Sequence, residues 1–101
     1  MSDVNPIDAR GHRCDVRVPG YVVWHDVDAD LVVFNAHDGT YHALDRTGSE
    51  VWRAVAREPR LDAVVAELRR RYPDAADVIA QDVRAFVNRA ARLGLLVVSI
   101  A

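Results

Sequence analysis

The sequence lacks several features that mark whole classes of protein. Its 101 residues include one cysteine, Cys14, which cannot form a disulfide within the chain, so we expect a core stabilised by packing and a reducing, cytoplasmic location. No apolar segment approaches the ~20 residues that a membrane-spanning helix needs. The N-terminus has neither the basic nor the apolar part of a signal peptide. We therefore expect no membrane partner.

An excess of positive charge is also absent. The thirteen basic residues are all Arg, fifteen residues are acidic, and the formal net charge is −2. Proteins that neutralise nucleic-acid phosphates usually carry a positive excess, so we expect no nucleic acid partner. The four histidines are dispersed, and there is no metal-ligand spacing, glycine-rich phosphate loop or nucleophile elbow. We therefore predict that the protein is not an enzyme and holds no cofactor or metal.

The first twenty residues show no clear periodicity and contain Pro6 and Gly11. We predict that residues 1–20 form a flexible or extended arm and that residues 21–101 form one domain. The segment "CDVRV" from Cys14 alternates weakly between apolar and polar residues. This pattern is compatible with a short extra strand or with an extended lead-in.

Three segments rich in β-forming residues follow the arm. They are Tyr21 to Val27, Leu31 to Ala36 and Thr40 to Leu44, separated by the turn sequences "DAD" and "HDG". Such short connections predict an antiparallel meander. In a meander the third strand lies at an edge, where its N–H and C=O groups stay available to another chain.

Helix signals begin after the third strand. Thr47 and Glu50 fit the S/T-x-x-E capping box, which predicts that a first helix starts at Thr47 and ends before "EP" at Glu58. Apolar residues at helical spacing from Leu61 predict a second helix that Pro73 ends.

Asp74 is a candidate cap for a third helix, which Gly94 would end. The predicted order is βββααα. The fold class is therefore α+β, with a winged helix-turn-helix-like arrangement of a three-stranded antiparallel sheet followed by three helices.

The third helix has two unlike flanks. At 100° per residue its core face is centred on Ile79, Val83, Phe86, Ala90 and Leu93. One flank consists of small apolar residues, which are Ala76, Ala80, Val87 and Ala91. Arg84 lies beyond this flank, toward solvent. The opposite flank carries Asp82 and Arg89. A flank of small residues admits an extended peptide, although alanines also serve helix propensity alone.

An edge strand beside such a flank favours β-augmentation, in which main-chain hydrogen bonds hold a peptide and pockets select its alternate side chains. Thr40 to Leu44 is the expected docking edge. Self-pairing of this edge in a dimer, or its cover by the N-terminal arm, is the competing interpretation. A winged-helix DNA-binding regulator is a further alternative, but Asp74, Asp77 and Asp82 would repel phosphate from the N-terminal half of the third helix.

The stretch "TYHALDRTGSEVWRAV" and the helical sequence after it resemble the PqqD-like family. Members of this family carry a pattern close to Y-x-L-N-x-T-G-x-x-I-W, and the resemblance covers residues 31–97. The matching residues are Tyr41, Leu44, Thr47, Gly48, Trp52 and the terminal Gly94, Leu95 and Leu96. Asp45 replaces the usual Asn, and "REPR" replaces the common Asp-Gly turn before the second helix.

The resemblance implies a stand-alone RiPP recognition element. Such a module is a peptide chaperone that binds the leader of a ribosomally made precursor peptide as an added strand, between the third strand and the third helix, and presents the precursor to a modifying enzyme. Carried over by position, the peptide-binding residues are Thr40, Tyr41, His42, Ala43, Leu44, Ala80, Val83, Arg84, Val87 and Ala91. Arg84 is the expected contact for a leader carboxylate, and Arg89 takes its place if the other flank faces the peptide.

The resemblance also bears on the partner enzyme. The stretch "NAHDGTY" before the third strand lacks the Pro-Glu-Arg-like sequence of members that serve quinone synthesis. A stand-alone domain favours a lasso peptide leader peptidase and cyclase, with a radical SAM maturase as the next candidate. We expect the protein to be a monomer or a weak homodimer.

Overall fold

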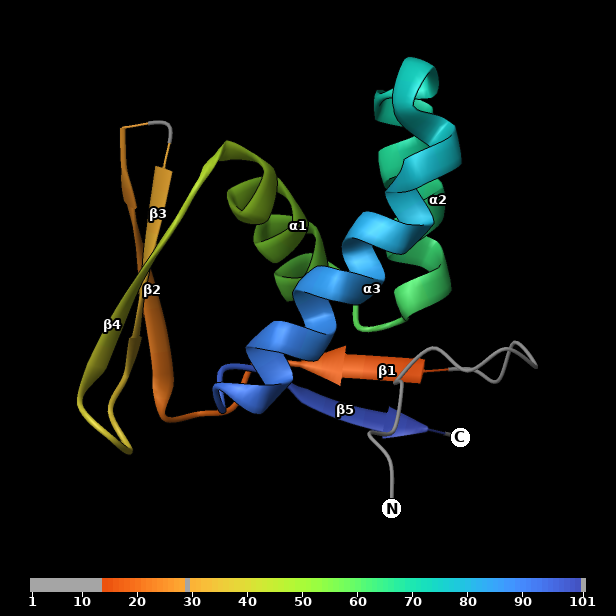
Figure 1. Cartoon of the computed structure of the whole chain (residues 1–101). Coiled ribbons are helices and arrows are strands. Elements are labelled where there is room, and N and C mark those ends of the chain that lie inside the picture. Colours follow the sequence, from red (N-terminus) through yellow and green to blue (C-terminus); the bar gives the residue numbers. More distant parts are fainter. Residues whose placement is uncertain (1–13, 29, 101) are drawn as a thin grey trace.

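The computed structural model describes residues 14–28 and 30–100 of the chain. Its elements follow the order β1 (Cys14–Arg17), β2 (Val22–Val27), β3 (Asp30–Asn35), β4 (Thr40–Leu44), α1 (Arg46–Arg57), α2 (Leu61–Arg71), the 3-10 helix η1 (Pro73–Ala75), α3 (Ala76–Arg92) and β5 (Val97–Ile100). The predicted βββααα series is confirmed as β2 to α3. A small sheet of β1 and β5 adds to it (Figure 1).

The main sheet is the predicted antiparallel meander. Its strand order is β2-β3-β4, with Trp24 opposite Val33 and Val33 opposite His42. Asp28 has a φ of 58° in the tight turn between β2 and β3, a conformation that Asp tolerates better than most residues. Among the described residues β4 pairs with β3 alone, so the prediction of an edge strand is confirmed.

The two ends of the described chain pair with each other. β1 lies antiparallel to β5, with Val16 opposite Val98, and the Val16 amide donates to the Pro59 carbonyl at 2.7 Å. Cys14 and Val16 are buried. Of the residues predicted as an arm, 14–17 therefore form the extra strand, and residues 1–13 lie outside the described part of the chain. The sequence had not indicated a strand in the tail after Gly94.

The start of α1 differs from the prediction. The helix begins at Arg46, and its N-cap is Asp45, whose Oδ1 accepts from the Gly48 amide at 2.8 Å. The capping box of Thr47 and Glu50 is therefore wrong. Glu50 instead accepts from Arg71 of α2 at 2.6 Å, because the helices lie close enough for this ion pair.

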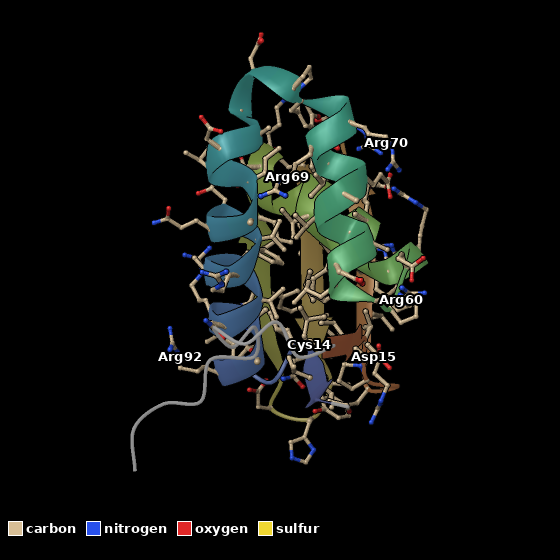
Figure 2. All side chains as sticks on the ribbon, turned by 90° about the vertical axis from the view of Figure 1, so that its right-hand side faces the viewer. Cys14, Asp15, Arg60, Arg69, Arg70 and Arg92 are labelled. Atoms are coloured by element: carbon tan, nitrogen blue, oxygen red, sulfur yellow. The ribbon has the colours of Figure 1, made fainter. Side chains whose placement is uncertain are left out.

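Helices α2 and α3 lie side by side (Figure 2). The second helix ends before Pro73, as expected, but η1 separates the two helices and Asp74 does not cap α3. The N-cap position is Ala75, which makes no side-chain capping bond. The Arg69 side chain ties the connection by donating to the Ala76 carbonyl at 3.2 Å. Gly94, with a φ of 78°, follows α3 as predicted.

All three helices lie on one side of the main sheet (Figure 1). Trp52 of α1 is fully buried between the layers, and its ring meets that of Trp24 edge to face with centroids 5.7 Å apart. Leu93, which the sequence placed on the core face of the third helix, is more open than expected, and so is the Trp24 ring beside Trp52. Trp24 is 39% exposed and Leu93 is 43% exposed. None of the helices in the described part of the chain lies on the other face of the sheet.

Candidate peptide-binding edge

The pairing of the sheet fixes which groups of β4 face the open edge. The Ala36 amide donates to the Tyr21 carbonyl at 2.9 Å, which makes Tyr21 and Ala36 a hydrogen-bonded pair. Hydrogen-bonded and non-hydrogen-bonded pairs alternate along antiparallel strands, so the alternate residues of β3 bond to β4. His42 of β4 therefore points its N–H and C=O groups at β3, and Tyr41 and Ala43 point theirs outward. The open edge presents two donors and two acceptors.

The same alternation separates the side chains of β4. Thr40, His42 and Leu44 lie opposite the buried Asn35, Val33 and Leu31, so they share the face toward the helices. Tyr41 and Ala43 lie on the outer face. A strand added at this edge would likewise send alternate side chains to the two faces.

The junction between β4 and α1 positions the end of this edge. Ser49 is fully buried, and its hydroxyl donates to the Leu44 carbonyl at 3.2 Å, while its amide donates to the Asp45 carbonyl. Gly48 lies so close to Phe86 that a Cβ atom there would meet the ring at 3.2 Å. The glycine thus lets α3 approach the first turn of α1.

A cavity of about 210 Å³ lies between β4 and α3. Its lining residues are His42, Ala43 and Leu44 of β4, Asp45, Gly48, the α3 residues Phe86, Arg89 and Ala90, and Leu93 and Leu95. The flank of α3 that faces β4 is therefore the one that carries Arg89. Of the two flanks that the sequence left open, the one with Arg84 does not line this cavity, and the alternative with Arg89 does.

The structure does not bring the predicted α3 residues to the edge strand. Val83 and Val87 are buried in the core, and Ala80, Arg84 and Ala91 are half-buried on the flank that does not line the cavity beside β4. The five predicted residues of β4 do lie together on the open edge. Sequence reasoning placed Phe86, Ala90 and Leu93 on the core face of the helix and so missed them as cavity residues.

A hydrogen-bond series runs along the start of β4. Asp38 Oδ1 accepts from the Thr40 hydroxyl at 2.6 Å and from its amide at 3.1 Å. Thr40 Oγ1 lies 2.9 Å from His42 Nε2. The side-chain hydrogen bond from Thr40 lowers the pKa of Asp38, so this carboxylate is ionised at neutral pH. The series holds the His42 ring at the cavity beside β4.

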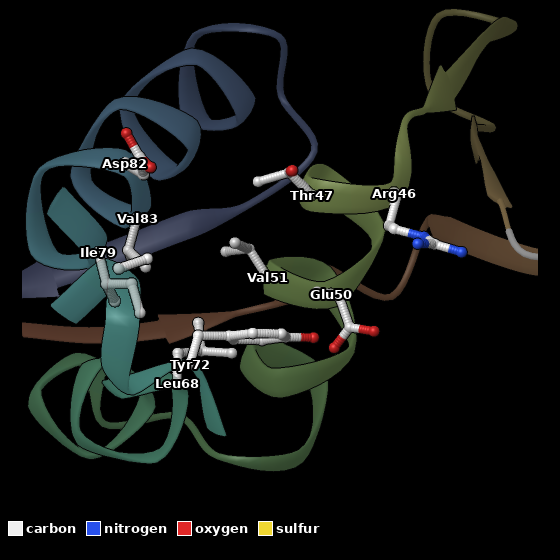
Figure 3. A pocket seen from close by; sticks show the side chains of 10 residues that line it. Arg46, Thr47, Glu50, Val51, Leu68, Tyr72, Ile79, Asp82 and Val83 are labelled. Atoms are coloured by element: carbon white, nitrogen blue, oxygen red, sulfur yellow. The ribbon is translucent and has the colours of Figure 1, made fainter. Parts of the chain in front are cut away.

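A second cavity, of about 250 Å³, lies between the three helices (Figure 3). Apolar side chains form its walls, among them Val51, Leu68, Ile79 and Val83, and Tyr72 lies beside them. Arg46, Thr47, Glu50 and Asp82 stand toward its rim. Arg46 begins α1, with Asp45 alone between it and the end of β4, so this cavity lies beyond the Leu44 end of the open edge. A cavity of about 150 Å³ holds a benzene molecule, so the space suits one large apolar side chain.

The outer face of the sheet is apolar and exposed. Val23 is 50% and Tyr41 72% exposed, and the rings of Tyr41 and Phe34 pack with centroids 4.6 Å apart. Exposed apolar patches of this kind mark interaction sites more often than isolated residues do. None of the described helices covers this face.

Comparison with known proteins identifies the family. The family model for coenzyme PQQ synthesis protein D (PqqD) matches residues 30–96, which is more than half of the chain. The chain belongs to the PqqD family. Its β4–α1 junction is the region where the family resemblance was detected in the sequence. No curated protein matches significantly.

One solved structure extends this relationship. The structure titled TbiB1 in complex with the TbiA(beta) leader peptide matches with a TM-score of 0.73 and 26% sequence identity, over 79% of this chain and 93% of that chain. In residues 14–28 and 30–100, no three His, Cys, Asp or Glu side chains gather in a way that would hold a metal ion. In the same residues, none of the helices is long and apolar enough to cross a bilayer.

Proposed function

We propose that this PqqD-family protein binds the leader segment of a ribosomally made precursor peptide as a strand added to β4. The observation that carries the proposal is the open edge at Tyr41 and Ala43, beside a cavity that α3 completes. The similarity to a protein solved with a leader peptide supports it. Main-chain pairing supplies affinity with little demand on sequence, and the cavities supply selectivity.

The leader backbone bonds to the N–H and C=O groups of Tyr41 and Ala43. The leader side chains opposite His42 and Leu44 then point toward α3, and those opposite Tyr41 and Ala43 extend the outer face. A residue beyond the Leu44 end reaches the cavity between the three helices, where the apolar walls favour a Leu or aromatic side chain.

The bound leader is presented to a modifying enzyme. We assign the docking of that enzyme to the outer face of the sheet, because this face is apolar, exposed and continuous with the leader strand. A lasso peptide leader peptidase and cyclase is the enzyme that we propose, and a radical SAM maturase is the second candidate.

DNA binding has less support than peptide binding. Asp74, Asp77 and Asp82 are exposed in η1 and the N-terminal half of α3, the region that a winged-helix protein inserts beside phosphates. Acidic side chains there oppose duplex binding.

Fluorescence polarisation with a labelled leader peptide, taken from the precursor encoded beside the gene, tests the proposal. Ala43→Pro removes one outward donor from the edge and leaves the pairs between β3 and β4 intact, so we expect leader affinity to fall by about tenfold or more. Ala43→Val keeps the donor and is the matched control, with affinity within about threefold of the wild type. Equal affinity for both folded variants would contradict binding at this edge.

A further inference from the structure

The hydrogen bonds of Thr40 fix the proton position on the His42 ring. A hydroxyl has one proton, and that of Thr40 goes to Asp38 Oδ1. Thr40 Oγ1 can then only accept from the ring nitrogen 2.9 Å away, so His42 Nε2 carries a hydrogen and donates. The neutral ring therefore offers a lone pair at Nδ1. When the ring is protonated, Nδ1 becomes a donor and Nε2 keeps its bond to Thr40.

Arg89 lies across the same cavity, on α3. Among the residues that the structure describes, its guanidinium makes no ion pair and no side-chain hydrogen bond. Three arginines of α1 and α2 differ from it, since Arg53, Arg57 and Arg71 each have a carboxylate partner. The cavity thus has, on one wall, a guanidinium that pairs with none of the described carboxylates and, on the other, a positioned imidazole.

We propose that His42 and Arg89 form a binding site for one carboxylate side chain of the leader peptide, at the leader position directly opposite His42 in the added strand. This inference rests on the proposed function and specifies its ligand. Residues opposite each other in a non-hydrogen-bonded pair have their side chains closest, and the outward-facing pair at His42 is of that kind. An Asp or Glu there reaches the imidazole from the strand side and the guanidinium from the helix side.

The two side chains recognise a carboxylate through their N–H groups. The guanidinium of Arg89 donates from the helix side, and an imidazolium at His42 donates through Nδ1 while Nε2 keeps its bond to Thr40. Together they favour a leader carboxylate over an apolar side chain.

The test uses the labelled leader peptide of the precursor encoded beside the gene, titrated with the full chain. His42→Gln should weaken binding by about threefold or more, because it removes the imidazole donor that faces the leader carboxylate. Arg89→Glu should weaken binding by about tenfold or more. Arg92→Glu, an exposed α3 position outside the cavity, is the matched control and should keep affinity within about threefold.

A reciprocal exchange identifies the leader residue. Each acidic residue of the leader is replaced in turn by Arg, and each peptide is titrated against the wild type and Arg89→Glu. One replacement should weaken wild-type binding and restore binding to Arg89→Glu to within about threefold of the original pair. If Ala43→Pro abolishes binding but neither Arg89→Glu nor any leader exchange changes it, the carboxylate site is wrong and the leader edge stands. If no leader peptide binds at all, both the carboxylate site and the proposed function are wrong.

Discussion

At the residue scale, the junction of β4 and α1 depends on Asp45. Its carboxylate satisfies the Gly48 amide, one of the four donors that a helix start leaves unpaired. Both Asp45 and Thr47 are residue types that can cap a helix N-terminus. The sequence favoured Thr47 as the cap because Glu50 follows it at the spacing of a capping box. The sequence alone does not reveal that the Glu50 side chain instead accepts a hydrogen bond from Arg71, twenty-one residues further along the chain.

Asp45→Ala should therefore lower the free energy of unfolding by about 1 kcal/mol, because the Gly48 amide loses its partner. Thr47→Ala should change it by less than about 0.5 kcal/mol, since Thr47 does not cap the helix. Urea unfolding monitored by the fluorescence of the buried Trp52 measures both. A larger loss for Thr47→Ala than for Asp45→Ala would restore the capping box.

The ion pairs of Arg71 connect two helices. Burial lowers the pKa of Arg71, but the carboxylates of Glu50 and Glu67 outweigh it and raise the pKa overall. The group stays charged at all ordinary pH values and links α1 to α2.

The pKa of Asp38 is lowered in the folded protein. The stability that its carboxylate contributes to the turn before β4 is therefore present at neutral pH and is lost as the pH falls through the folded-state pKa.

At the scale of elements, the sequence predicted what local periodicity encodes. The strands β2, β3 and β4 alternate or carry β-forming residues between clear turns, and α2 and α3 carry apolar stripes. Strand β5 was missed because its partner is β1, at the other end of the chain. The flank of α3 stayed open between Arg84 and Arg89, because periodicity defines two flanks of a helix but not the packing that turns one of them toward β4.

The same long-range pairing makes β1 part of the core. Val16 is 1% exposed, so Val16→Ala should lower the free energy of unfolding by about 2 kcal/mol. Val78 of α3 is 48% exposed, and Val78→Ala is the matched control, with a change of less than about 0.5 kcal/mol. Denaturant unfolding tests this, by comparing the midpoints of the two variants at an unchanged m-value. Equal midpoints for both variants would mean that β1 is not packed into the domain.

At the scale of the whole molecule, the proposed function uses two surfaces. It assigns the leader to the β4 edge and its cavities, and the modifying enzyme to the outer face of the sheet. The site could be predicted from the sequence as far as the edge strand, because an edge follows from the meander order. The cavity walls depend on how three helices pack, which no local pattern specifies.

Val23 lies on the outer face, two strands away from the leader edge. Val23→Arg should leave leader affinity within about threefold but slow leader processing by the partner enzyme about tenfold or more, because it buries a charge in an apolar interface. Val78→Arg, at an equally exposed valine, is the control for added charge. Processing assays with the purified enzyme decide the question. Normal processing with Val23→Arg would exclude this face.

Amide hydrogen exchange with and without the leader peptide tests the central claim most directly. The account predicts that the Tyr41 and Ala43 amides become protected when leader is added, because the added strand accepts their hydrogen bonds. The Trp24 amide points outward at the opposite edge of the same sheet and should exchange at an unchanged rate. Leader binding that protects Trp24, or that leaves Tyr41 and Ala43 unprotected, would contradict strand addition at β4.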